Sequence, residues 1–238
     1  MCFRRIWPTT IVRSTATNAE LFMTDLMSRF ITLEGGEGVG KSTNLEAIAD
    51  FLRSEGDEVV VTREPGGTPY AEELRSVLLR PRSEVVMPSA ELLTLFAARA
   101  QHWHGLIVPA LERGAWVLSD RFVDATYAYQ GAGRGLDVAD IASLEQWLLQ
   151  GRKPGLTLLL DMPVEDGMAR ARARAALDRF ESEKIAFFER VRAGYLARAA
   201  EDPERMKRID AGQPLHKVQA DVLQVIHAYQ LALKGGKA

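Results

Sequence analysis

A glycine-rich stretch near the start of the chain, LEGGEGVGKSTN at residues 33–44, has the spacing of a loop that binds phosphate. Gly35 and Gly40 enclose four residues, and Lys41 and Ser42 follow directly. The backbone N–H groups of such a loop, with the start of the following helix, surround a phosphate with partial positive charge. The lysine reaches the β- and γ-phosphates of a nucleoside triphosphate, and the serine hydroxyl ligates Mg²⁺. The predicted phosphate-binding residues are Gly35, Gly36, Glu37, Gly38, Val39, Gly40, Lys41, Ser42 and Thr43.

A second candidate site is WVLSDRF at residues 116–122, where an apolar run ends in Asp120 and Arg121. An acid in this place can hold Mg²⁺ through water. Many parallel strands also end in Asp to form a turn or cap, so the aspartate alone does not distinguish a metal site from a structural turn. Arg121 favours the metal interpretation, because it places a bidentate phosphate donor beside the acid. Asp161 ends another apolar run without such a partner, and we interpret it as structural.

A third stretch, TREPGGTPYAEELR at residues 62–75, combines a stiff loop with charged residues. Prolines and glycines at 65, 66, 67 and 69 restrict the backbone. The stretch is either a solvated turn or a holder for a second substrate at the edge of a sheet. Its candidate binding residues are Arg63, Glu64, Pro65 and Arg75.

The helical stretch ELLTLFAARAQHWH at residues 91–104 places Phe96 and Arg99 three positions apart on one side. An aromatic ring and a guanidinium in this arrangement can stack on a base and hydrogen-bond to it. Without context, a core Phe and a surface Arg are the simpler interpretation. His102 and His104 are two apart and do not share a helix face, which argues against a metal site made by this pair.

An arginine-rich run, GMARARARAALDRFESE at residues 167–183, contains Arg170, Arg172, Arg174 and Arg179. A helix places Arg170 and Arg174 on one face and Arg172 nearly opposite. Such a run usually forms a solvated face. The phosphate loop has glycine at position 38, however, and phosphoryl transfer requires positive charge in the transition state. The run is therefore a candidate source of that charge.

Apolar stretches of two kinds alternate along the chain. They predict the strands and helices that position the candidate binding residues. Short β-rich runs predict strands at 29–34, 58–63, 115–120, 156–161 and 206–210. Longer stretches predict helices at 43–54, 70–80, 89–113, 138–149, 165–176, 181–200 and 214–233. Alternation of this kind predicts an α/β fold with a parallel sheet between helices, whose ligands bind at the carboxyl ends of the strands.

We expect one domain over residues 29–238, with a lid at about 167–182. Residues 1–28 are predicted to be a disordered or spurious leader, since they show no lasting periodicity and contain two further methionines, Met23 and Met27. A composition faintly like that of a transit peptide is the alternative explanation.

The 238 residues include 47% apolar residues, enough for a substantial core. The formal net charge of −2 argues against a nucleic-acid partner, because no strong positive field attracts a polyanion. The single cysteine fits a reducing compartment, and no apolar run reaches the roughly 18 residues of a membrane span. We therefore expect a soluble, cytoplasmic protein with no membrane partner.

In combination, these stretches closely resemble bacterial thymidylate kinases of the type that carries its catalytic arginine in the lid. EGGEGVGKST, TREPGGTP, FAARAQ, DRFVDATYAYQGAGRG and RARARAALDRFE occur in the family's order and approximate spacing. The resemblance extends from about residue 29 to the C-terminal helix. It implies the P-loop nucleoside monophosphate kinase fold, a five-stranded parallel sheet flanked by helices on both faces with a short lid.

The resemblance also implies an activity, the transfer of the γ-phosphate of ATP to dTMP to give dTDP and ADP, with Mg²⁺ as cofactor. It implies a homodimer, and the helix at 89–113 is a candidate for its interface. The resemblance implies catalytic roles for Lys41, Asp120, Arg121 and Arg174. It places Arg170 and Arg179 near ATP. The implied metal ligands are Ser42 and, through water, Asp120. The implied dTMP site contains Glu34, Arg63, Glu64, Pro65, Arg75, Phe96, Arg99, Arg121, Thr126, Tyr129 and Gln130.

In one respect the sequence departs from the family. Several relatives carry a stacking aromatic residue four positions before the base-reading arginine, where this chain has Leu95. Phe96, three positions before Arg99, is the nearest aromatic candidate.

Other functions remain as alternatives. Another nucleotide or nucleoside kinase would use the same loop. A P-loop GTPase switch would need a guanine-reading Asn-Lys-x-Asp segment, which the sequence lacks, and a P-loop ATPase driven by nucleic acid would need an acid pair where Asp120 and Arg121 stand.

Overall fold

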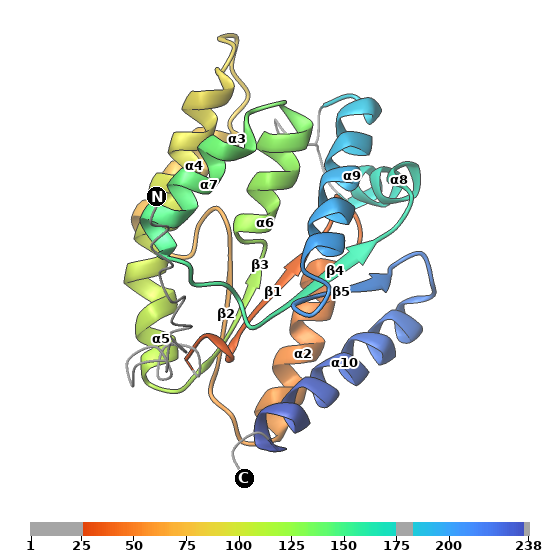
Figure 1. Cartoon of the computed structure of the whole chain (residues 1–238). Helices are drawn as coiled ribbons and strands as arrows, with labels where there is room; N and C mark the ends of the chain where they lie inside the picture. The colour runs from red at the N-terminus through yellow and green to blue at the C-terminus, as the bar shows by residue number, and fades with distance from the viewer. Residues whose placement is uncertain (1–25, 175–182, 236–238) are drawn as a thin grey trace, which may run out of the picture.

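Five strands form one parallel sheet in the order β2-β3-β1-β4-β5 (Figure 1). The structure, a computed structural model, describes residues 26–174 and 183–235, and of Arg174 it describes the backbone alone. The strands are β1 (Phe30–Glu34), β2 (Val59–Arg63), β3 (Trp116–Asp120), β4 (Leu156–Asp161) and β5 (Met206–Asp210). All five predicted strands are confirmed. β1 and β4 are buried along their whole length, as expected for continuous apolar runs covered on both faces.

The register of the sheet aligns the carboxyl ends of three strands. In β1, Leu33 pairs with Asp120 of β3, and Asp120 in turn pairs with Arg63 of β2. The loops that follow these three strands therefore leave the sheet side by side. Those loops are the glycine-rich loop, the segment after Asp120 and the loop that begins at Arg63.

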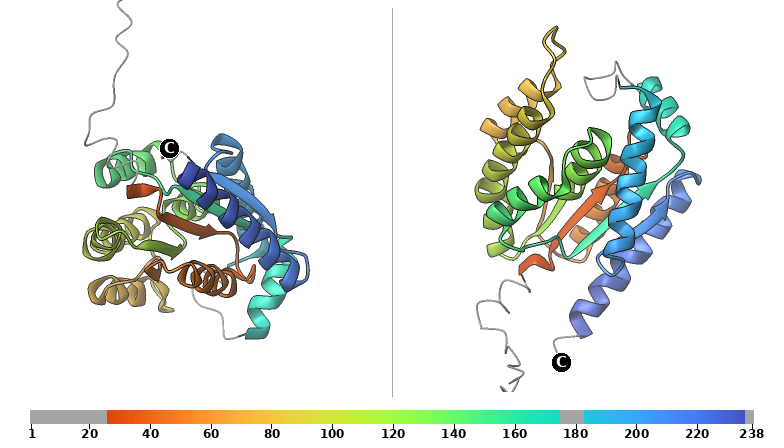
Figure 2. Two further views of the ribbon diagram at one scale, coloured as in Figure 1. Left: turned by 90° about the horizontal axis from the view of Figure 1, so that it is seen from below. Right: turned by 45° about the horizontal axis from the view of Figure 1, so that its top comes forward.

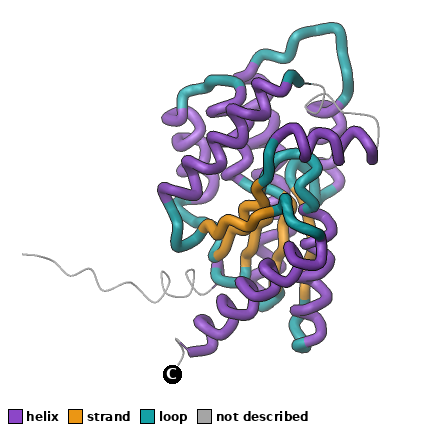
Figure 3. The backbone as a smooth tube through the Cα atoms, turned by 90° about the vertical axis from the view of Figure 1, so that its right-hand side faces the viewer, coloured by secondary structure: helices purple, strands orange, loops and turns teal. Residues whose placement is uncertain are grey.

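Helices cover both faces of the sheet (Figures 1 and 2). They are α2 (Lys41–Ser54), α3 (Pro69–Leu79), α4 (Pro88–His102), α5 (Val108–Glu112), α6 (Val123–Thr126), α7 (Val138–Leu149), α8 (Val164–Arg174), α9 (Ile185–Glu201) and α10 (Leu215–Gly235), with π-helical turns at η1 (Trp103–Ile107) and η2 (Tyr127–Gly133). One core cluster joins α2 and α10 to one face. Two others join α4, α5, α7, η2 and α9 to the opposite face. The tube in Figure 3 shows the strands between these layers.

Two features of the helices differ from the prediction. The single helix expected at 89–113 is interrupted by the π-helical turn η1, directly before Pro109. Proline lacks the N–H that a continuous α-helix needs, and a wider turn accommodates this. The segment 123–133 was not predicted as a helix but forms α6 and η2. Tertiary packing explains it, because a Cβ on Gly133 would lie 2.7 Å from the Phe187 ring of α9.

The described chain begins before the predicted domain boundary at residue 29. Leu26 and Met27 are buried in a core cluster, and the Met27 carbonyl accepts a hydrogen bond from Gly155 N at 3.0 Å. The remainder of the predicted leader, residues 1–25, lies outside the described residues. Of the predicted lid, 167–174 belong to α8 and 175–182 lie outside the described residues. No helix in the described ranges has the length and apolar character needed to cross a membrane.

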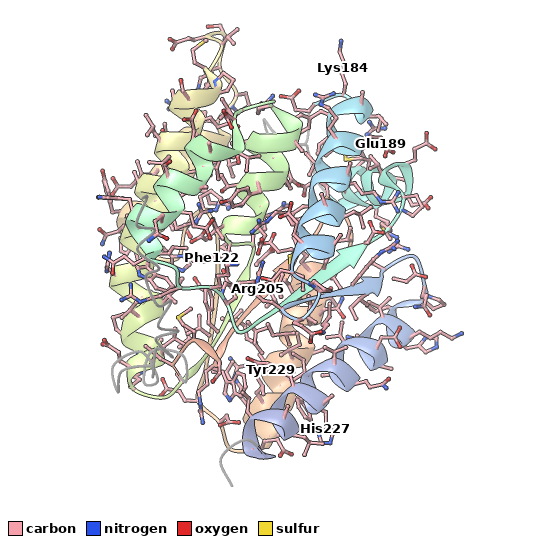
Figure 4. All side chains as sticks on the ribbon, in the orientation of Figure 1. Phe122, Lys184, Glu189, Arg205, His227 and Tyr229 are labelled. Atoms are coloured by element: carbon pink, nitrogen blue, oxygen red, sulfur yellow. The ribbon has the colours of Figure 1, made fainter. Side chains whose placement is uncertain are left out.

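A buried ion cluster fixes α6 against α9 and the start of β5. Asp124, with no exposed surface, accepts hydrogen bonds from Arg205 at 2.7 and 3.1 Å and from Arg198 Nε at 3.1 Å. Arg205 also donates to Thr157 Oγ1 of β4 at 2.8 Å. Figure 4 shows Arg205 at the centre of the molecule, between α9 and β5. The cluster connects the sheet to the helix that follows Arg121.

We expect Asp124→Ala to lower the free energy of unfolding by about 3–5 kcal/mol, because it leaves two guanidinium groups without their buried carboxylate. Glu58→Ala is the matched control, since Glu58 forms an exposed pair with Arg113 and its loss costs about 1 kcal/mol or less. Urea denaturation of both variants measures the difference. Equal losses would show that the cluster does not anchor α6.

Candidate active site

A cavity of about 470 Å³ opens at the carboxyl edge of the sheet. It lies among the glycine-rich loop, the loop after β2, the helix α4 and the segment after β3. Most predicted site residues line it: Glu37, Gly38, Val39, Gly40, Lys41, Ser42, Thr43, Arg63, Glu64, Pro65, Arg75, Arg99, Asp120, Arg121, Thr126, Tyr129 and Gln130. Stretches far apart in the sequence therefore surround one space.

The glycine-rich loop and the start of α2 form one end of the cavity. Gly40 caps α2 with a left-handed backbone (φ 90°) and makes no side-chain cap, so the first N–H groups of the helix stay available to an anion. Lys41 Nζ donates to the carbonyls of Gly36 at 2.8 Å and Gly35 at 3.3 Å. Burial lowers the pKa of this ammonium, and the nearby Arg121 adds to the effect. A phosphate bound here would favour the charged form.

The loop also contacts the first turn of α8 through two glycines. Gly38 has a left-handed backbone (φ 69°), and a Cβ added to it would lie 1.9 Å from the Gly167 carbonyl oxygen. A Cβ on Gly167 would in turn lie 2.4 Å from the Glu37 carbonyl oxygen. Neither position has room for a side chain. The arginine-bearing helix therefore begins directly on the phosphate loop.

Arg121 connects the phosphate loop to the segment after β3. Its Nη2 donates to Glu37 Oε1 at 2.7 Å, and its guanidinium lies 4.7 Å from the centre of the Tyr129 ring. Tyr129 donates its hydroxyl to the same Glu37 oxygen at 2.6 Å. Burial alone would raise the pKa of Glu37, but Arg121 and Lys41 lower it to about 2. The backbone of Arg121 is left-handed (φ 70°), a conformation that non-glycine residues adopt rarely and often at functional sites.

Asp120 lines the cavity and has one oxygen without a hydrogen-bond partner in the described part of the chain. Its Oδ1 is buried and has no hydrogen-bond partner among the described residues. Ser42 lines the same cavity. Carboxylate and hydroxyl oxygens suit a hard cation such as Mg²⁺, and a buried acceptor without a partner is unfavourable unless a ligand or water satisfies it. The donor set therefore fits the implied metal.

Arg63 at the end of β2 and Arg75 of α3 line the cavity together with Arg121. Arg63 pairs with Glu72 at 3.0 Å, and Arg75 Nη1 donates to the Pro65 carbonyl at 2.8 Å. Burial lowers the pKa of Arg75, and repulsion by Arg63 and Arg121 lowers it further. A bound anion would relieve this repulsion. The arrangement indicates a second phosphate site, separate from the glycine-rich loop.

Arg99 presents a second unsatisfied group. Its Nε donates to Glu64 Oε2 at 2.7 Å and its Nη2 to Thr126 Oγ1 at 3.0 Å. The third nitrogen, Nη1, is buried and has no hydrogen-bond partner in the described parts of the chain. Arg99 lines the cavity, and a buried donor without a partner is unfavourable unless a ligand or water satisfies it.

Phe96 does not lie where a base-stacking residue was expected. It is absent from the cavity lining, belongs to a core cluster and supports the Arg99 guanidinium at 4.9 Å from its ring centre. Leu95 lines the cavity instead. The helical repeat explains the difference, because residues four apart share a face more closely than residues three apart.

Glu34 is buried behind the cavity and not on its lining. Its carboxyl group accepts hydrogen bonds from Phe122 N at 2.7 Å and from the Tyr195 hydroxyl at 2.8 Å. Burial and the charge of Asp124 raise the pKa of Glu34 to about 8. Its position supports the segment after Asp120 and does not give it direct contact with the cavity.

The remaining predicted residues lie apart from this cavity. Gly35 and Gly36 line a smaller cavity of about 20 Å³ on the other side of the loop. Arg170 donates to the Ala211 carbonyl at 3.2 Å and is not on the lining of the main cavity. The backbone of Arg174 ends α8, its side chain is not described, and Arg179 lies outside the described residues. Asp161, interpreted as structural, pairs with Arg192 and Arg208 at 2.7 Å.

Sequence reasoning missed several supporting residues. Glu91, almost fully buried, accepts a hydrogen bond from Gln130 Nε2 at 2.8 Å, and Tyr195 holds Glu34 from α9. The signal for Tyr195 is the glycine before it, since a Cβ on Gly194 would lie 2.7 Å from Ala132. A glycine inside a helical stretch indicates such close packing. Leu79, Leu95, Phe122 and Ala125 complete the lining.

The phosphate loop follows the central strand of the sheet, and an acid ends the neighbouring strand. These features define a P-loop nucleotide-binding protein. A second group of cationic residues in the same cavity is the arrangement of a small-molecule kinase. A family model for thymidylate kinase matches residues 33–222. The chain belongs to the thymidylate kinase family, whose members are nucleoside monophosphate kinases.

Individual relatives agree with this assignment. The chain is 61% identical to a thymidylate kinase of Teredinibacter turnerae over 86% of its own length and all of the relative's. It is 58% identical to one from Alcanivorax borkumensis, over 86% of this chain and 99% of the relative. The crystal structure of thymidylate kinase from Ehrlichia chaffeensis matches with a TM-score of 0.69 and 30% identity, over 84% of this chain and 98% of that chain. Fold and sequence thus agree.

The raised pKa of Glu34 predicts a pH-dependent effect of Glu34→Gln. Between pH 4.5 and about 8 the folded wild-type protein retains a proton that the unfolded chain releases, so its stability falls as the pH rises. Glutamine carries no such proton. We therefore expect the stability of Glu34→Gln relative to wild type to increase from pH 5 to pH 8 and to level off above that range.

Urea denaturation at several pH values measures this difference, with Glu46→Gln on the exposed face of α2 as the control. A difference that is flat across the same range would mean that Glu34 titrates in the folded protein as it does in the unfolded chain.

Proposed function

We propose that the residues of this cavity carry out the reaction of the thymidylate kinase family, the transfer of the γ-phosphate of ATP to dTMP. The main observation is that one cavity connects the phosphate loop, three clustered arginines and the unsatisfied Arg99 Nη1. A triphosphate, a monophosphate and a base each find complementary groups there. A nucleoside without a phosphate would bring no anion to these arginines.

The loop and Lys41 hold the phosphates of ATP, while Arg63, Arg75 and Arg121 hold the phosphate of dTMP. A nucleoside monophosphate has a second pKa of about 6, so its attacking oxygen is largely deprotonated at neutral pH. No general base is required. The residues accelerate transfer by aligning two anions and reducing their repulsion.

Ser42 and Asp120 are the residues that hold Mg²⁺, the latter through water. When bound, the ion neutralises charge on the β- and γ-phosphates of ATP. The buried Oδ1 of Asp120 supports this role, since no described residue satisfies it.

Arg99 recognises the base by donating Nη1 to a carbonyl oxygen of thymine. Thr126 and Gln130 line the same side, and Leu95 with Phe122 supplies apolar walls for the ring. Phe96 acts behind Arg99 as a support and does not cover the base. Tyr129 lines the cavity, and its role in this proposal is to oppose a 2′-hydroxyl and so favour deoxyribose.

We also propose that the protein is a homodimer that uses the outer side of α4. Met87 and Leu93, at the N-terminal cap and on α4, are exposed, as are Tyr70 and Val77 on the adjoining α3. Exposed apolar residues that gather on packed helices suit an interface between subunits.

An acceptor panel tests the reaction directly. ADP release is measured with ATP, Mg²⁺ and each of dTMP, dUMP, dCMP, dGMP and thymidine. We expect dTMP to give the highest kcat/KM, and Lys41→Ala to abolish nearly all turnover at an unchanged melting temperature. Faster turnover of thymidine than of dTMP would favour a nucleoside kinase, and an unchanged rate in Lys41→Ala would contradict the role of the loop.

The arginine-rich helix supplies the transition-state charge that Gly38 cannot. If Arg174 contacts the phosphoryl group chiefly in the transition state, Arg174→Ala lowers kcat and kcat/KM by similar factors, on the order of 10³. Arg172→Ala is the control, since Arg172 is exposed on the same helix and points nearly the opposite way. Steady-state kinetics on both variants tests this role of Arg174. Equal small losses would make the run a solvated face, and a rise in the KM for ATP alone would assign Arg174 to ATP binding.

A further inference from the structure

His102, the last residue of α4, has no exposed surface and takes no part in the reaction described above. It lies one helical turn beyond Arg99. Both side chains reach the same carboxylate, that of Glu64, which belongs to the loop after β2. A fully buried polar side chain next to the base-binding arginine requires an explanation.

The hydrogen bonds around His102 form a directed chain. Its Nδ1 lies 3.2 Å from Glu64 Oε1, and its Nε2 lies 2.7 Å from Thr62 Oγ1. A carboxylate paired with a guanidinium only accepts hydrogen bonds, so Nδ1 carries the proton. In the neutral ring Nε2 is then an acceptor, and the Thr62 hydroxyl donates to it. The carboxylate sets the tautomer, the Thr62 hydroxyl adapts to it, and the imidazole fixes one oxygen of Glu64.

The other oxygen of Glu64 determines how Arg99 is held. Oε2 receives Arg99 Nε at 2.7 Å, and Thr126 receives Nη2, while Nη1 is left without a partner in the described residues. Nε and Nη2 lie on the same edge of the guanidinium, so Glu64 and Thr126 together hold that edge. The bond from His102 to Oε1 restrains the Glu64 carboxylate. Through that carboxylate it restrains the orientation of the Arg99 guanidinium.

The loop backbone keeps the imidazole in place. Gly67 has a left-handed backbone (φ 88°), and a Cβ added there would lie 2.4 Å from His102 Nε2 and 2.6 Å from Thr62 Oγ1. The bare backbone thus packs directly on the ring. The two glycines of the EPGG stretch and the histidine that follows FAARAQ belong to one packed unit.

We propose that His102 is a positioning residue for base recognition, which holds the Glu64 carboxylate and thereby fixes the orientation of the Arg99 guanidinium toward the nucleobase. The inference rests on the proposed role of Arg99 in dTMP binding. His102 itself touches no substrate. It affects the affinity for dTMP through Glu64 and Arg99.

Two amide substitutions distinguish the role of His102 Nδ1 from that of Nε2. In His102→Asn the side-chain amide lies near the position of Nδ1 and can still donate to Glu64. In His102→Gln the amide reaches the position of Nε2, so it contacts Thr62 and leaves Glu64 Oε1 without a donor. Both variants remove the ring and leave a comparable space, so their melting temperatures should fall by similar amounts.

We expect the KM for dTMP to rise about tenfold in His102→Gln and less than about threefold in His102→Asn, as loss of a buried hydrogen bond implies. The kcat at saturating dTMP and the KM for ATP should change little in both variants, because the phosphate loop is untouched. Thr62→Val is a second test. It removes the partner of Nε2, so it should lower stability and leave the KM for dTMP close to that of wild type.

An equal rise in the KM for dTMP in the Asn and Gln variants, or a rise in Thr62→Val as large as in His102→Gln, would overturn the proposal and leave His102 as a structural residue. Failure of the proposed function has a different signature. In that case the wild-type enzyme would not prefer dTMP in the acceptor panel, whatever the variants do.

Discussion

The ion pair between Glu37 and Arg121 joins the two segments on which the site depends. They are 84 residues apart in sequence and meet because β1 and β3 are neighbours in the sheet. The pair holds a guanidinium beside the phosphate loop, where Tyr129 supports it from below. A cation placed in advance needs no reorganisation when an anion arrives, and this is the basis of electrostatic catalysis.

A second buried ion cluster fixes the segment that follows Arg121. Buried charges are costly unless each has its partners, and here Asp124 with Arg198 and Arg205 satisfies that requirement within the fold. The cluster anchors α6, the element that leads from Arg121 to Thr126. The binding residues of the segment after β3 are therefore fixed at both ends. Two residues that line the cavity each keep a buried group without a partner among the described residues, Asp120 Oδ1 and Arg99 Nη1.

Much of this arrangement could be predicted from sequence because its signals are local. Four of the five strands are near-continuous apolar runs, and the phosphate loop has a fixed spacing that backbone geometry imposes. The helix at 123–133 depends on contacts with distant residues such as Phe187, which no local pattern contains. The π-helical turn before Pro109 has a local cause, since proline lacks the N–H of a continuous helix, but the proline does not specify the type of turn. The same limit applies to Phe96, whose ring could face the core or the cavity until the rotation of α4 was known.

The glycine-to-glycine contact between position 38 and position 167 limits where this protein can place a positive charge. An arginine at 38 would collide with the Gly167 carbonyl and would occupy a left-handed backbone. One substitution therefore cannot add a cation at this point of the phosphate loop. The start of α8 would have to move away from the loop first, so the two segments can change only together.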